Sequence, residues 1–74
     1  MSIYRTGNVT FDNAVLAAEL TRQNALAVAG LTAAAAHTAD VNYFTTVVAA
    51  GLANGISVVN EQTALHSLQS TGNA

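Results

Sequence analysis

Two long runs without a charged side chain, residues 23–39 and 41–60, constrain this chain more than any other feature. A helix of about 20 mostly apolar residues can span a bilayer, and both runs approach that length. Both runs also contain polar side chains, among them His37, Asn42 and Asn54. No Trp belt and no pattern of Lys/Arg flanks marks a membrane interface or an orientation, since Arg22 is the single basic residue beside either run. The N-terminus lacks the apolar core of a signal peptide. We therefore expect a cytoplasmic chain whose apolar segments are buried in protein.

The composition indicates that one copy cannot bury its own apolar surface. The 74 residues are 51% apolar and only 8% charged, whereas an ordinary soluble domain is about 25% charged. A chain this short is near the lower limit for a self-sufficient core, and it has no cysteine for a disulfide. The sequence therefore predicts a subunit that packs against copies of itself.

The absence of proline and the sixteen alanines predict an all-α fold. We expect a flexible or extended arm over 1–10, one helical assembly domain over 11–70, and a frayed tail over 71–74. Within the domain, a first helix over about 11–36 has Thr10 or Asp12 as its N-cap, and Thr38 or Asp40 caps a second over about 41–68. These segments form either a helical hairpin or one long broken helix, because Thr38 and Asp40 compete for backbone hydrogen bonds.

The apolar faces predict where copies meet. In the first helix, Leu16, Leu20, Ala27 and Leu31 form the main stripe. In the second, helical spacing places an apolar arc over half the circumference, too wide for one partner helix. The predicted assembly interface consists of Phe44, Val48, Gly51, Leu52, Gly55 and Val59. Gly51 and Gly55 have the spacing that allows two helix backbones to approach closely, so we expect leucine there to block assembly and alanine to be tolerated.

The sequence contains no pattern typical of catalysis or cofactor binding. No Ser/His/Asp spacing, phosphate loop or pair of histidines at i, i+4 is present, so we predict no catalytic, cofactor-binding or metal-binding residue. Two arginines and a net charge of −2 do not provide the basic surface that nucleic-acid binding needs. We expect a non-enzymatic protein.

The stretch AAGLANGISVVNEQTALHSLQSTG (residues 49–72) resembles the killing-trait family, the small subunits of bacterial R-bodies. The residues in comparable places are Gly51, Asn54, Val58, Val59, Gln62, Ala64, Leu65, Thr71 and Gly72. The early proline and the glutamine run common in that family are absent. The resemblance implies an insoluble polymer in the bacterial cytoplasm, formed with itself or with paralogous subunits. It also implies a ribbon that rolls into a scroll and extends on acidification to disrupt membranes, which enter only as the target.

Such extension needs a group that changes charge in mild acid, and histidine is the side chain suited to it. The candidate pH switch is His37 with Asp40 at the expected hinge, together with His66 near the end of the second helix. Two other functions remain compatible with the sequence. One is a small membrane-active protein of the holin or pore-forming kind, and the other is a subunit of a different helical filament or tube.

Overall fold

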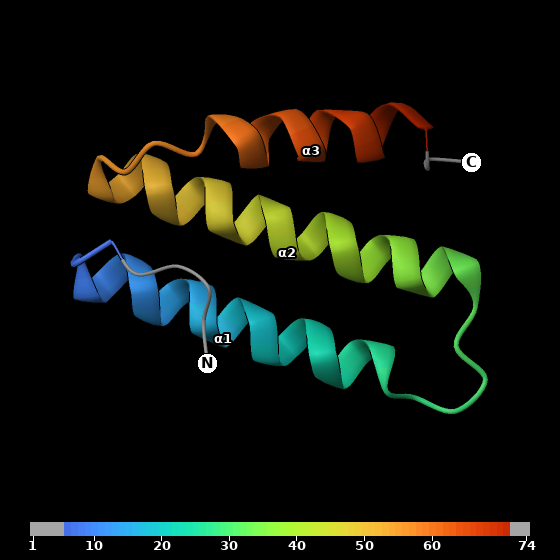
Figure 1. The fold of residues 1–74 in the computed structure, drawn as a ribbon. Coiled ribbons are helices and arrows are strands. Elements are labelled where there is room, and N and C mark those ends of the chain that lie inside the picture. Colours follow the sequence, from blue (N-terminus) through green and yellow to red (C-terminus); the bar gives the residue numbers. More distant parts are fainter. Residues whose placement is uncertain (1–5, 72–74) are drawn as a thin grey trace.

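The computed structural model describes residues 6–71, which form three helices: α1 (Val9–Leu26), α2 (Ala33–Asn54) and α3 (Val59–Thr71) (Figure 1). No strand occurs in this part of the chain, and the predicted all-α fold is confirmed. The predictions made for residues 1–5 of the arm and 72–74 of the tail lie outside the described residues.

The helices run antiparallel in a row, with α2 between α1 and α3 (Figure 1). Both outer helices contact α2, and within residues 6–71 they do not contact each other. The Cα atoms extend over 37 × 25 × 16 Å. In a closed three-helix bundle each helix covers the other two. Here α1 and α3 each have a side that no described helix covers.

α1 begins earlier than predicted, because Asn8 is its N-cap in place of Thr10 or Asp12. The Asn8 side-chain oxygen accepts a hydrogen bond from the Phe11 N–H at 2.9 Å, which satisfies a free donor of the first turn. The Asp12 carboxylate accepts hydrogen bonds from the Thr6 N–H at 3.1 Å and from its hydroxyl at 2.9 Å. The segment predicted as an arm therefore contains an ordered helix start from Thr6 onward.

The connection between the first two helices lies at residues 27–32, earlier than the predicted hinge. α1 ends at Leu26, and Gly30 adopts a left-handed conformation with φ of 73°. Thr32 then caps α2, since its hydroxyl oxygen accepts a hydrogen bond from the Ala35 N–H at 3.0 Å. The predicted first helix over 11–36 is therefore wrong at its end, and Ala33–Ala36 belong to α2.

The predicted hinge at His37–Asp40 is wrong because its polar side chains are satisfied within a continuous helix. The Thr38 hydroxyl donates to the Ala34 carbonyl one turn earlier, at 3.1 Å. Asp40 pairs with Arg22 of α1 at 2.8 Å. Neither side chain competes for a backbone group that the helix needs.

The predicted second helix over 41–68 is also wrong, because it breaks at residues 55–58. Gly55 ends α2 with φ of 69° and ψ of 25°. The Gly51 carbonyl accepts hydrogen bonds from the N–H groups of Gly55 and Ile56, the latter at 2.8 Å. The bond from Ile56 is the one found in a Schellman ending and the bond from Gly55 is the one found in the αL motif, and both endings commonly use a left-handed glycine. The structure is therefore neither a hairpin of two helices nor one long helix.

The core is small and lies between α1, α2 and the connection that follows α2. Phe11, Val15 and Val47 are fully buried, and Ala18, Tyr43 and Val58 complete the cluster. α3 contributes no buried residue among the side chains described. It packs on α2 only through partly buried positions, so most of the apolar burial holds α1 onto α2.

Candidate assembly surface

Three of the predicted interface residues lie in contacts within the chain. Phe44 and Val48 are partly buried and pack against the core, and Gly51 is buried in α2. The other three are exposed: Gly55 is the cap that ends α2, while Leu52 and Val59 are 65% and 64% exposed. The single stripe assumed for these residues does not exist, because the break at Gly55 places Val59 on α3.

Gly51 allows a close approach by a side chain of the same chain, whereas the prediction was a close contact between two helix backbones in the assembly. A Cβ at this position would collide with Val58 Cγ1, and it would lie 3.2 Å from the Ile56 carbonyl oxygen. Val58 is buried and precedes α3 directly. Gly51 therefore forms the niche that receives the start of the third helix. The expectation that alanine is tolerated at Gly51 conflicts with this contact. The expectation that alanine is tolerated at Gly55 is also in conflict with the structure, because Gly55 has a positive φ that residues with a side chain rarely adopt.

The leucines of α1 face the opposite way from the one that the stripe suggested. Phe11, Val15 and Ala18 are the buried residues of α1, whereas Leu16 and Leu20 are 38% and 52% exposed. Each leucine is two residues from Ala18, about 200° around the helix. The sequence signal for the true inner face was the spacing Phe11–Val15–Ala18, which competes with the leucine stripe at the same helical period.

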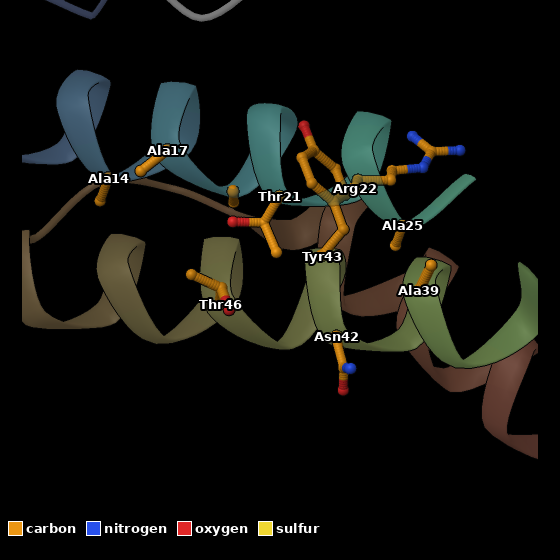
Figure 2. A pocket seen from close by; sticks show the side chains of 10 residues that line it. Ala14, Ala17, Thr21, Arg22, Ala25, Ala39, Asn42, Tyr43 and Thr46 are labelled. Carbon is orange, nitrogen blue, oxygen red and sulfur yellow. The ribbon is translucent and has the colours of Figure 1, made fainter. Parts of the chain in front are cut away.

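A groove of about 320 Å³ lies between α1 and α2, and small side chains line most of it. Figure 2 shows Ala14, Thr21 and Ala25 directed from α1 toward α2, with the Tyr43 ring rising from α2 toward α1. Asn42 points away from α1. The remaining lining residues are Ala17, Ala18, Arg22, Ala39 and Thr46. The groove is thus apolar and shallow.

Arg22, at one end of this groove, is the charged residue that joins α1 to α2. Its Nε lies 2.8 Å from Asp40 Oδ1, and both atoms are shielded from solvent. The two atoms form an ion pair, although their geometry is not that of a well-directed hydrogen bond. The guanidinium also lies over the Tyr43 ring, 5.2 Å from its centroid. Because both side chains are partly exposed, the ion pair itself contributes at most about 1 kcal/mol.

The candidate pH-switch residues do not gather at one place. His37 is partly buried in α2 and lines a second hollow with Thr38, Val41 and Gln69 of α3. Asp40 faces Arg22. His66 is exposed on α3. Their role in a pH response stays a prediction.

The described residues 6–71 form neither a metal site nor a membrane-spanning helix. They contain no cluster of three or more His, Cys, Asp or Glu side chains able to hold a metal ion. None of the three helices combines the length and the hydropathy needed to cross a bilayer.

Comparisons with protein families, with curated proteins and with solved structures find no match for this chain. The resemblance of residues 49–72 to the killing-trait family therefore stays a prediction.

Proposed function

We propose that this chain is a non-enzymatic structural subunit of a self-assembling helical polymer. The observation that carries the proposal is the open row of helices, in which α1 and α3 contact α2 but not each other. An arrangement of this kind leaves helix sides uncovered that a closed bundle buries. Copies of the same chain supply the missing cover.

The distribution of apolar side chains supports this proposal. Among the described residues, the large apolar side chains left exposed outnumber the six residues of the core cluster: Val9, Leu16, Leu20, Val28, Leu31, Leu52 and Val59. A further copy of the chain that covers these side chains removes their apolar surface from water, which favours association. The exposure spans all three helices and one connection.

The scarcity of charge supports the same function. α2 contains 22 residues and a single Asp, Glu, Lys or Arg side chain, Asp40, which Arg22 of the same chain neutralises. Its exposed positions are mostly alanine, threonine and asparagine. A partner can cover such a surface without the desolvation cost of burying charges.

The more specific form of the proposal is an R-body-like ribbon or scroll, built from this chain or from this chain with paralogues. In this form the polymer is an insoluble assembly in the bacterial cytoplasm that extends on acidification and disrupts membranes. This form rests on the resemblance of residues 49–72.

The test is to express the chain in bacteria, fractionate the cells without detergent, and image the pellet by negative stain at pH 7.5 and 4.5. We expect the chain to pellet without lipid and to form ribbons. Recovery from the membrane fraction only with detergent would instead support a membrane-active protein, and tubes would support another filament. A chain that remains a folded monomer of 7.5 kDa at high micromolar concentration would overturn the proposal.

A further inference from the structure

The groove between α1 and α2 has the character of a helix-packing site. Its lining includes five alanines, and no acidic side chain reaches it. Arg22, its one charged residue, is held by Asp40 and by the Tyr43 ring. Most of the exposed wall is apolar, although Thr21 and Thr46 also line the groove, so it offers few directed hydrogen bonds to a polar ligand. It fits the larger apolar side chains of a second helix.

The same chain exposes larger apolar side chains on the outer side of α1. Leu16 and Leu20 are spaced i, i+4, so that they form one ridge along the helix surface. Both point away from α2, because the buried face of α1 is made by Phe11, Val15 and Ala18. This leucine ridge, Leu16 and Leu20, is exposed in the single chain.

We infer that the leucine ridge of one copy inserts into the alanine-lined groove of the next copy. The inference rests on the proposed function and names the contact that would build the polymer. Large side chains on one surface facing small ones on the other give the interdigitation found in well-packed helix interfaces. The groove places no unpaired charge in the contact, since Arg22 keeps its partner Asp40.

The geometry of this contact determines the type of assembly. The ridge and the groove occupy different sides of α1, so a copy that donates its ridge keeps its own groove open. Such a contact is heterologous, and it produces an open chain of subunits unless the rotation between copies closes a ring. One interface therefore suffices to add copies without limit.

The first experiment compares variants of the two surfaces by analytical ultracentrifugation. The ridge variant is Leu16→Ser with Leu20→Ser, and its control is Val28→Ser with Leu31→Ser, two loop residues that are 54% and 37% exposed. The groove variant is Ala17→Leu with Ala25→Leu, and its control is Ala34→Leu with Ala53→Leu, exposed residues outside the groove. We expect the ridge and groove variants to need at least tenfold higher concentration to assemble, while both controls assemble like the wild type.

Mixing the two defective variants gives the sharpest result. The ridge variant retains a groove and the groove variant retains a ridge, so an equimolar mixture can form one contact and no more. We expect a 1:1 dimer of about 15 kDa, twice the 7.5 kDa chain, and no polymer. A mixture that stays monomeric, or variants that polymerise as readily as their controls, would overturn the inference.

A cross-linking experiment tests the same contact with one substitution in each copy. The chain has no cysteine, so Leu20→Cys and Ala17→Cys can be introduced in separate copies, mixed and oxidised. We expect a disulfide between Leu20→Cys and Ala17→Cys chains, and little between Val28→Cys and Ala17→Cys chains. Equal cross-linking of both pairs in a wild-type-like polymer would overturn the contact and leave the proposed function standing. A wild-type chain that never assembles would overturn the function itself.

Discussion

At the scale of single residues, Gly51 is the position where the smallest change has the clearest consequence. We expect Gly51→Ala to lower the free energy of unfolding by about 1–2 kcal/mol. The added Cβ collides with Val58, and overpacking costs about 1–3 kcal/mol, partly offset by the gain of up to about 1 kcal/mol in helix propensity. Urea unfolding followed by circular dichroism, at a concentration where the chain is monomeric, measures the change.

The control is the same substitution in a Val58→Ala background. Removing the two Val58 methyl groups takes away the atoms that the new Cβ meets, so the loss caused by Gly51→Ala should fall by half or more. A coupling of this kind between contacting residues is what a double-mutant cycle isolates. An identical loss in both backgrounds would mean that Val58 does not occupy the niche beside Gly51.

At the scale of helices, the start of α2 can be tested with one type of substitution at two threonines. Thr32→Ala removes the N-cap whose oxygen accepts from the Ala35 N–H, and we expect it to cost about 1 kcal/mol. Thr38→Ala removes a hydroxyl that bonds within the helix. It should be neutral or stabilise by a few tenths of a kcal/mol, because alanine has the higher helix propensity. The reverse order in thermal unfolding would place the helix start at Thr38.

The comparison of these two threonines explains which helical features could be predicted from the sequence. Alanine content and the lack of proline were enough for the all-α class, because propensity sums over many residues. The helix ends were not predictable, since Thr32 and Thr38 are equally good caps until the chain's three-dimensional path is known. Thr38 stays helical partly because the next polar residue, Asp40, meets Arg22 of α1. That contact spans 18 residues of sequence and leaves no local signal.

The residues of the predicted assembly interface could also be predicted only in part from the sequence. Phe44, Val48 and Gly51 carry a real apolar face, but part of that face is used by the chain's own core. α1 has two competing apolar stripes, the leucine stripe and the Phe11–Val15–Ala18 face. The Tyr43 and Val47 side chains of α2 meet one of them, and this contact decides which stripe is buried. Periodicity alone identified the leucine stripe, and it did not reveal that the leucines are on the outer side.

At the scale of the whole molecule, the few charges decide how an assembly should respond to salt. Among the described residues, Arg22 and Asp40 neutralise each other, and the full chain has a net charge of −2. In the proposed assembly, contacts between copies would then depend on apolar burial, which added salt does not screen. Self-repulsion between subunits is also weak, because it grows with net charge.

We therefore expect the concentration at which the chain begins to pellet to change less than about twofold between 0.1 and 1 M NaCl, although the Debye length falls from about 10 to about 3 Å. Sodium sulfate should lower that concentration, because it strengthens the burial of apolar surface, and cooling should raise it, because apolar association weakens in the cold. Sedimentation of one preparation across these conditions measures all three effects. Polymers that dissolve in NaCl and survive cooling would indicate that ion pairs hold the copies together, which the exposed Leu16, Leu20, Leu52 and Val59 do not explain.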